Sequence, residues 1–307
     1  MTLVEIKSLN NKNKKYYFEN TKIKTPFSDE AINFLNDIHC AINKNRKKYS
    51  EAEFSFSFWC RKKNIESLKN NYDDIESRLG IGKIFHIPPS NTPINFAYSL
   101  AFGILSGCSN IIRISPNVYN EIKQLLLLII KLSKLKKHKE INSMLIFVKY
   151  ESTNSEELNT FFSKFSDARL IWGGDNTIQK FKTYQTQSHT LDIPFYDRYS
   201  LSVINTNYIS KLNDEELYKI ARSFYNDTYY VDQNACSSPH LISWIGNKNK
   251  KIDLFWNILE KFVCNKYSFK EISSIDKYTQ LIKNITNIKD YKNFINHSNL
   301  IIRFQLK

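Results

Sequence analysis

Residues 84–115 read Ile-Phe-His-Ile-Pro-Pro-Ser-Asn-Thr-Pro, then Ile-Asn-Phe-Ala-Tyr-Ser-Leu-Ala-Phe-Gly-Ile-Leu-Ser-Gly-Cys-Ser, then Asn-Ile-Ile-Arg-Ile-Ser. The first four residues form a short apolar run closed by two prolines, which predicts a buried strand. Residues 94–106 are apolar on nearly every side, which predicts a buried helix, and residues 110–115 predict a second strand. A strand, a helix and a second strand within about 30 residues make a βαβ unit with parallel strands.

The same alternation continues toward the C-terminus. We expect a helix over 119–134, a third strand over 143–150, a helix over 156–165, a fourth strand over 168–172, a helix over 175–182 and a fifth strand over 201–204. Alternation of this kind is typical of an α/β protein with a mostly parallel, doubly wound sheet and helices on both faces.

The segments on either side of this alternation have a different pattern. Helical patterns occur at residues 28–42, 65–79, 214–225 and 252–263, and a strand pattern occurs at 241–245. We therefore expect two lobes with a boundary near Asn205. Residues 1–205 would hold an N-terminal region and a dinucleotide-binding lobe, and residues 206–307 would form a smaller α/β catalytic lobe.

The composition describes a folded, basic protein. Of its 307 residues 42% are hydrophobic, and its net charge is +14. No apolar run reaches the roughly 18 residues that span a bilayer, and the N-terminus has no apolar signal core, so we expect a cytoplasmic protein. The charge is compatible with nucleic acid, an acidic partner or an anionic cofactor. It is spread along the chain without a recognisable nucleic-acid-binding module, which argues against nucleic acid.

One of the five cysteines, Cys236, lies in an unusual setting. The stretch 229–239 reads Tyr-Tyr-Val-Asp-Gln-Asn-Ala-Cys-Ser-Ser-Pro. Its Asn and Ser residues favour a turn and Pro239 has no N–H, so we expect a tight loop that presents a thiol beside free N–H groups. Such a loop suits a covalent thioester mechanism, although a lone cysteine is more often a small buried apolar residue. The odd number and wide spacing of the cysteines predict neither a disulfide framework nor a zinc site.

Three further loops follow predicted strands at their carboxyl ends, where open parallel sheets bind ligands. The loop 88–93 holds Asn91 between prolines, and a stiff loop can aim an amide at an oxyanion. Arg113 lies near the end of the second strand, where a guanidinium can bind a ribose 2′-phosphate. Gly173 and Gly174 precede a helix and permit close approach of a phosphate or a nicotinamide. The plain alternatives are a turn residue, a surface ion pair and an ordinary strand-to-helix turn.

Taken in order, these segments resemble a known family. Pro-Pro-Ser-Asn-Thr-Pro at 88–93, Gly-x-x-Asn-Ile-Ile-Arg-Ile at 107–114, Trp-Gly-Gly at 172–174 and Asp-Gln-Asn-Ala-Cys-Ser-Ser-Pro at 232–239 are similar to segments of the bacterial acyl-CoA (acyl-protein thioester) reductases. That family includes the reductase of the bioluminescence fatty-acid reductase complex and lies within the aldehyde dehydrogenase superfamily. The resemblance implies an aldehyde-dehydrogenase-like fold and NADPH-dependent reduction of a long-chain fatty acyl thioester to the aldehyde.

The resemblance also implies roles for individual residues. Cys236 would take the acyl group as a thioester, and Asn91 would act with the Cys236 N–H as the oxyanion hole. Arg113 and Ser115 would lie at the adenosine ribose, where a cation fits NADPH, and Gly173 and Gly174 would face the cofactor. The implied partners are a fatty acyl-CoA, an acyl-carrier protein or an acyl-synthetase protein, with a homo- or hetero-oligomer possible.

Two departures from the family pattern concern activity. Oxidising members of the superfamily use a glutamate to activate water, and residues 191–200 offer only Asp192 and Asp197 in its place. Its absence favours reduction, because hydride rather than water then attacks the acyl-enzyme. Family members also continue well past the cysteine, so we expect a chain shortened at its C-terminus. A catalytically silent paralogue that serves as a binding or partner subunit is the alternative.

Overall fold

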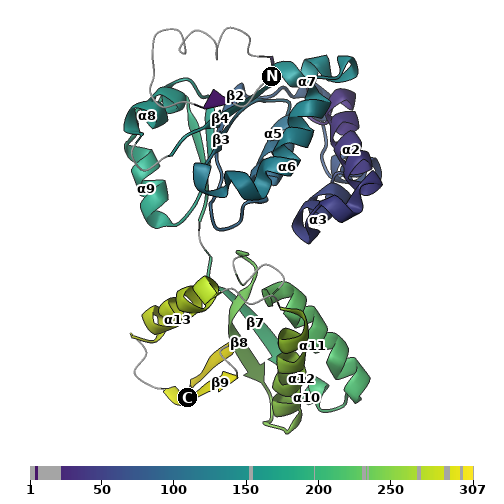
Figure 1. Ribbon diagram of the computed structural model, residues 1–307, viewed down its shortest axis with the longest axis vertical. Helices are drawn as coiled ribbons and strands as arrows, with labels where there is room; N and C mark the ends of the chain where they lie inside the picture. Colours follow the sequence, from purple (N-terminus) through teal and green to yellow (C-terminus); the bar gives the residue numbers. More distant parts are fainter. Residues whose placement is uncertain are drawn as a thin grey trace. The chain divides into compact units, whose positions relative to one another are not determined.

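The computed structural model describes residues 4–5, 22–151, 155–196, 198–229, 233, 235–267, 271–286, 291–297 and 300–306. The chain divides into two compact units, residues 1–197 and residues 198–307 (Figure 1). Each unit is described by itself.

The first unit is built on a six-stranded sheet in the order β1-β4-β3-β2-β5-β6, in which every neighbouring pair is parallel. Its strands are β1 (Val4–Glu5), β2 (Lys83–Ile87), β3 (Ser109–Ile114), β4 (Leu145–Lys149), β5 (Ala168–Trp172) and β6 (Leu191–Phe195). All six residues of β3 are buried, three isoleucines together with Ser109, Asn110 and Arg113. The predicted doubly wound α/β sheet is confirmed.

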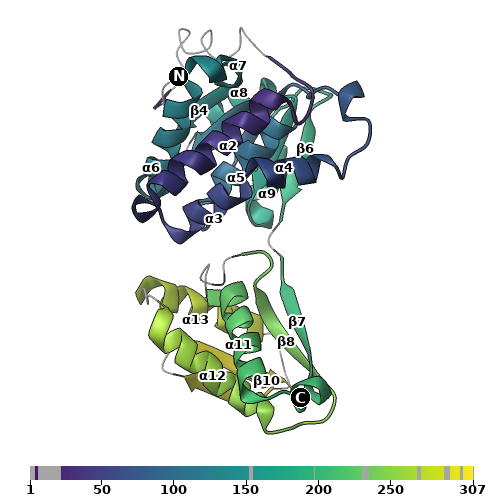
Figure 2. The same cartoon turned by 90° about the vertical axis from the view of Figure 1, so that its right-hand side faces the viewer.

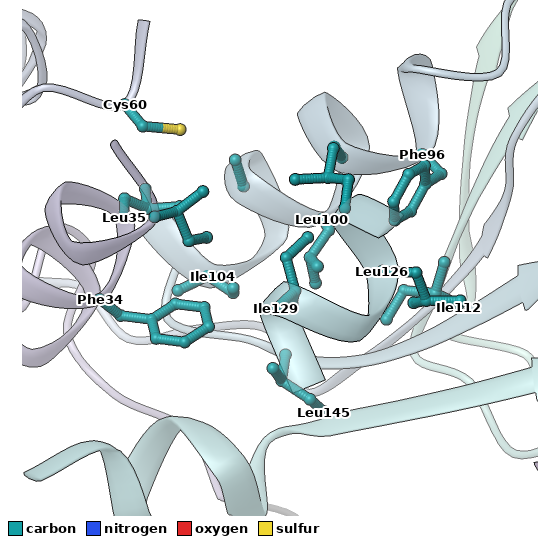
Figure 3. Packing of buried hydrophobic residues seen from close by; sticks show 14 of the residues in the cluster. Phe34, Leu35, Cys60, Phe96, Leu100, Ile104, Ile112, Leu126, Ile129 and Leu145 are labelled. Carbon is teal, nitrogen blue, oxygen red and sulfur yellow. The ribbon is translucent and has the colours of Figure 1, made fainter. Parts of the chain in front are cut away.

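Helices cover both faces of this sheet (Figure 1). One face carries α5 (Asn95–Leu105) and α6 (Pro116–Ser133), with α2 (Asp29–Lys44) and α3 (Glu51–Trp59) packed against them. The other face carries α8 (Glu156–Lys164) and α9 (Asp175–Thr183). Figure 3 shows the first of these two cores, to which α2 contributes Phe34 and Leu35 and α5 contributes Leu100 and Ile104. Shorter helices are α4 (Lys62–Lys69), α7 (Lys139–Ser143) and the 3-10 turns Arg46–Lys48, Ile75–Ser77 and Lys136–His138.

Two predictions within this unit were wrong. The helix expected over 65–79 ends at Lys69, because four of residues 70–74 are Asn or Asp, whose side chains favour turns. Asp74, at the end of this stretch, has a left-handed backbone with φ of 55°. The fifth strand of the sheet is β6 rather than 201–204. The sequence pattern did not predict β6 because Pro194 lies within it and proline is rare in strands. Proline is tolerated here because β6 is at the edge of the sheet.

The second unit pairs β7 (Ser200–Asn205) with β8 (Pro239–Ile245) in parallel. Residues 200–205, which the sequence placed in the first lobe, therefore belong to the second unit in the structure. Alternate residues of the pair, among them Ile204, Ile242 and Trp244, pack against a core made by α11 (Asp214–Thr228) and α12 (Lys251–Lys266). The remaining elements are α10 (Thr206–Ile209), α13 (Glu271–Ile285) and the antiparallel strands β9 (Tyr291–His297) and β10 (Ile301–Leu306).

Candidate functional site

The three loops singled out in the first unit lie on one edge of the sheet. They follow β2, β3 and β5, and β2 pairs with both of the other two strands. Because all three strands are parallel, their carboxyl ends meet at the same edge. The structure therefore brings the loop 88–93, Ser115 and the pair Gly173–Gly174 to neighbouring positions.

Asn91 lies exposed in the first loop, directly ahead of α5. The loop turns into the helix through backbone hydrogen bonds from Asn95 N–H to the Thr92 carbonyl (3.0 Å) and from Phe96 N–H to the Pro93 carbonyl (3.4 Å). Pro88 is buried beside the strand end, so the loop is anchored at both ends while Asn91 between them is exposed.

Arg113 is buried at the end of β3 with little compensation for its charge. Its side chain is 6% exposed, and its one hydrogen bond to a described residue, from Nη1 to the Tyr150 carbonyl, is long at 3.5 Å. Nε has no partner among the described residues. Burial lowers the pKa of Arg113, and Tyr150 and the nearby Glu151 oppose this. A buried guanidinium with unused donors is costly, so this position suits an anionic ligand.

Ser115 is the N-cap residue of α6 and is buried, at 7% exposure. Pro116 occupies the first helical position, where its missing N–H costs nothing. The Ser115 hydroxyl makes no capping bond to the helix. Together with Arg113, two residues earlier, it places a hydroxyl and a guanidinium at the positive end of an 18-residue helix.

Gly173 and Gly174 form the turn between β5 and α9. Gly173 has a φ of +157°, and a Cβ added there would lie 3.0 Å from Cβ of Thr177. A side chain at this position would be strained, so the turn keeps a bare backbone. Gly174 is the N-cap residue of α9 and accepts hydrogen bonds from the N–H groups of Thr177 (2.9 Å) and Ile178 (3.2 Å).

A buried polar chain lies behind this edge and had not been predicted. Trp172 Nε1 donates to Ser99 Oγ (3.3 Å), which lies 2.8 Å from His86 Nδ1. His86 Nε2 lies 2.9 Å from Asn110 Oδ1. Because that amide oxygen can only accept, His86 carries its proton on Nε2. Gly103 makes room for the chain, since a Cβ there would collide with the Asn110 amide. The His86 side chain at the centre of this chain is fully buried.

The indole of Trp172 is also held from its other side. Its ring stacks on that of Phe195 with centroids 4.0 Å apart and planes 7° apart. Trp172 immediately precedes Gly173, so the hydrogen bond to Ser99 and the stack with Phe195 together hold the start of the glycine turn. The sequence signal for this arrangement was weak, because Ser99 and Phe195 lie far from Trp172 along the chain.

Cys236 lies in a turn of the second unit. The Ser238 N–H donates to the Ala235 carbonyl (2.9 Å), and the buried Ser238 hydroxyl donates to the Asp227 carbonyl (2.6 Å). The Ser200 hydroxyl donates to the Cys236 carbonyl (2.6 Å). The Cys236 side chain is exposed, and none of the described residues accepts a hydrogen bond from its N–H. The expected tight turn with a presented thiol is therefore present, while Asp232 and Asn234 lie outside the described residues.

The other four cysteines differ from Cys236 in setting. Cys60 and Cys108 are buried, and burial raises the pKa of both thiols. Cys40 and Cys264 are exposed, but they lie within α2 and α12. Cys236 is thus the exposed thiol that a turn presents. Across the part of the chain that the structure describes, no group of three His, Cys, Asp or Glu residues could hold a metal ion.

Of the two acidic residues considered as water-activating bases, only Asp192 lies within the described residues. Asp192 forms a bidentate pair with Arg169, from Nε to Oδ1 and from Nη2 to Oδ2, each at 2.6 Å. Arg169 is 2% exposed and also donates to the Phe181 carbonyl (2.8 Å). Asp192 therefore holds β6 to β5, and Asp197 lies outside the described residues. His240 is exposed and lies against the Tyr199 ring with centroids 5.4 Å apart.

The fold is that of the aldehyde dehydrogenases. The structure is similar to an aldehyde dehydrogenase from Bartonella henselae (TM-score 0.59, 10% identity), a match that covers 90% of this chain and 63% of that one. It is also similar to a glyceraldehyde-3-phosphate dehydrogenase from Methanocaldococcus jannaschii solved with NADP (TM-score 0.56, 11% identity, 90% of this chain and 65% of that one). A benzaldehyde dehydrogenase from Corynebacterium glutamicum gives a TM-score of 0.59 at 9% identity and covers 95% and 68% of the two chains.

Within that fold class, the chain belongs to the LuxC acyl-CoA reductase family, whose model matches residues 5–262. The predicted family is thereby confirmed. The chain spans about three fifths of the Bartonella henselae enzyme's length, 63%. A comparison with curated protein sequences gives no match. In the described residues, no helix is both long enough and apolar enough to cross a membrane.

Proposed function

We propose that this protein reduces a fatty acyl thioester to the aldehyde with NADPH, through a covalent acyl group on Cys236. The observation that carries the proposal is the exposed thiol of Cys236 in a hydrogen-bonded turn, inside the region that matches the acyl-CoA reductase family. The fold class and the family both support aldehyde chemistry.

The protein's own groups carry the first half-reaction. The Cys236 thiolate attacks the thioester carbonyl, a new carbon–sulfur bond forms, and the bond to the carrier sulfur breaks. The carrier thiolate leaves and takes up a proton from solvent. The Cys236 N–H, unused by the described residues, and the exposed Asn91 amide are suited to stabilise the oxyanion. This role requires that Asn91 and Cys236 meet at one substrate.

The carboxyl edge of the first unit supports binding of a phosphorylated dinucleotide. Arg113 offers for a 2′-phosphate a buried Nε that no described residue pairs with, and Ser115 offers a hydroxyl that makes no capping bond to α6. Gly173 keeps the turn after β5 free of side chain. When bound, NADPH supplies the hydride that converts the acyl thioester into the aldehyde and frees the thiol. Of the two candidate bases, Asp192 is committed to Arg169, which disfavours hydrolysis of the acyl-enzyme.

Intact-mass spectrometry after incubation with a long-chain acyl-CoA tests the covalent step. We expect one acyl adduct on the wild type, no adduct on Cys236→Ala, and an unchanged adduct on Cys40→Ala, which removes an exposed thiol from a helix. Full labelling of Cys236→Ala would refute the acyl-cysteine. Addition of NADPH should discharge the adduct and release aldehyde.

The oxyanion role of Asn91 is tested by the rate of that acylation. We expect Asn91→Ala to slow it by roughly 10²–10³-fold, the usual cost of removing one such donor. Ser90→Ala, a change at the adjacent exposed residue, should leave the rate within about twofold. Equal rates for the two variants would remove Asn91 from the site.

The same measurements address the carrier and the alternative function. Acyl-CoA, an acyl-carrier protein and an acyl-synthetase protein are compared as donors at equal acyl concentration, and the true donor gives the fastest adduct formation. A protein that forms no adduct with any donor and does not bind NADPH would be a silent binding or partner subunit instead.

A further inference from the structure

A surface groove in the first unit lies on a different element pair from the candidate site. The helices α2 and α6 lie side by side (Figure 2), and a groove of about 550 Å³ runs between them. Its lining comes from α2, α6 and the turns that follow these two helices. None of the residues of the candidate site lines it.

The floor of this groove is apolar and open to solvent. Leu127, Leu128 and Leu135 line it from α6 and the residues just beyond that helix. Leu127 is 47% exposed and Leu135 is 42% exposed. Apolar side chains gathered in a groove at this exposure are typical of a surface that a partner covers.

The rim of the groove is positively charged. Lys44, Lys48 and Lys131 line it and are exposed, and none of them forms an ion pair with a described residue. The one acidic side chain in the lining, Asp37, is already engaged by Lys137 and by His138, whose Nε2 lies 2.7 Å from its carboxylate. The groove therefore presents three uncompensated positive charges around a leucine floor.

We propose that this groove binds an acidic amphipathic helix of a partner protein. A helix that lies along two packed helices places an apolar stripe on the leucines, and carboxylates on its flanks meet the three lysines. Charge complementarity favours an acidic partner helix over two other occupants, the N-terminal residues of this chain and a second copy of it. Residues 6–21 contain four lysines and one glutamate, and a second copy brings a net charge of +14, so both are electrostatically disfavoured. The proposal does not depend on the reductase activity.

Fluorescence anisotropy with the full-length protein tests this inference. The probe is a fluorescein-labelled, side-chain-stapled 18-residue helical peptide with leucines on one face and glutamates along its flanks. We expect saturable binding that weakens as salt rises from 50 to 300 mM, because exposed charge pairs are screened. The same peptide with lysine in place of each glutamate should not bind.

Three variants locate the binding surface. Leu127→Glu should weaken binding at least tenfold by placing a like charge on the floor, and Lys44→Glu combined with Lys131→Glu should do the same at the rim. Both alter exposed side chains and should leave the melting temperature unchanged. Lys261→Glu, the same charge change at an exposed position of α12, should leave binding within twofold.

Several results would overturn the proposal. Equal binding of the acidic and basic peptides, or acidic-peptide binding that survives Leu127→Glu, would exclude helix recognition in this groove. Displacement of the peptide by adenosine 3′,5′-bisphosphate would assign the lysines to a nucleotide. A dimer in sedimentation velocity that Leu127→Glu dissociates would make the groove a contact between copies of this chain.

Discussion

At the residue scale, His86 shows how a buried titratable group is kept neutral. Its ring is fully buried and lies between Ser99 Oγ and Asn110 Oδ1. Burial lowers its pKa to about 4, while the hydrogen bond to Asn110 opposes the shift. The neutral ring holds Ser99, and Ser99 accepts from the Trp172 indole, so His86 acts on the glycine turn through two intermediaries.

The low pKa of His86 predicts a loss of stability in acid. Between pH 6.5 and about 4 the unfolded chain binds a proton at His86 that the folded chain does not, so the free energy of unfolding falls as the pH falls. We expect a contribution of about 3 kcal/mol across that interval. Urea unfolding of the wild type and of His86→Gln at pH 7 and pH 4.5 measures it. The variant should be less stable at pH 7 but should lose less stability on acidification, and parallel losses would contradict the assignment.

Gly173 is the second residue whose backbone predicts a measurable effect. Its φ of +157° and the close approach of Thr177 oppose any side chain, whereas Gly174 has a φ of −68° that every residue adopts. We expect Gly173→Ala to lower the free energy of unfolding by about 1–3 kcal/mol. The matched change Gly174→Ala should cost less than about 1 kcal/mol. Urea unfolding compares them, and equal costs would show that the turn has no special requirement at Gly173.

At the element scale, one buried ion pair attaches the edge strand β6. Arg169 of β5 reaches Asp192 of β6 with two hydrogen bonds of 2.6 Å, and the Asp192 side chain is 27% exposed. The Nη1 group of Arg169 donates to the Ser163 hydroxyl and the Phe181 carbonyl. The pair thus links two strands to α8 and α9.

Removal of the carboxylate from this pair leaves a buried charge. We expect Asp192→Asn to cost about 3 kcal/mol, at the low end for a buried pair because Asp192 is partly exposed. Glu66→Gln, which breaks the exposed pair with Lys62, should cost less than about 1 kcal/mol. Urea unfolding measures both. If the unpaired Arg169 guanidinium causes the destabilisation by Asp192→Asn, the double variant Arg169→Leu with Asp192→Leu will recover at least half of the lost free energy of unfolding.

At the scale of the whole molecule, each unit carries its own hydrophobic core. The clusters around Leu126 and Phe162 belong to residues 1–197, and the cluster around Leu259 belongs to residues 198–307. Residues that share a core unfold cooperatively, so we expect the consequences of a core mutation to remain within one unit.

Hydrogen exchange followed by mass spectrometry tests this independence. Leu259→Ala, at a position with 0% exposure, should destabilise the second unit by about 2–5 kcal/mol and speed exchange in α11 and α12. Peptides from α5 and β3 should keep wild-type rates. Leu126→Ala, also at 0% exposure, should give the reverse pattern. Faster exchange throughout the chain in either variant would show a single cooperative unit.

Residues 84–115 predicted the core of the fold because both faces of β2 and β3 are buried. Such strands are rich in apolar residues, here isoleucine and phenylalanine, and prolines and glycines lie near their ends, so each signal lies within a few neighbouring residues. The resemblance to the reductase family was likewise carried by short stretches of neighbouring residues, the segments that hold Asn91, Arg113, Gly173 and Cys236. It was sufficient to predict the family.

Only the tertiary structure decided the remaining features, because they depend on partners that are distant in the sequence. Pro194 lies in a strand because Arg169 and Asp192, 23 residues apart, hold that strand to the sheet edge. His86 is neutral because packing buries its ring completely, and Ser99 of α5 and Asn110 of β3 lie at hydrogen-bond distance from its two nitrogens. The sequence by itself determined which segments are buried, since burial is recorded in local composition. Pairing between buried polar groups is not recorded there, because its free energy arises only when separate elements pack together.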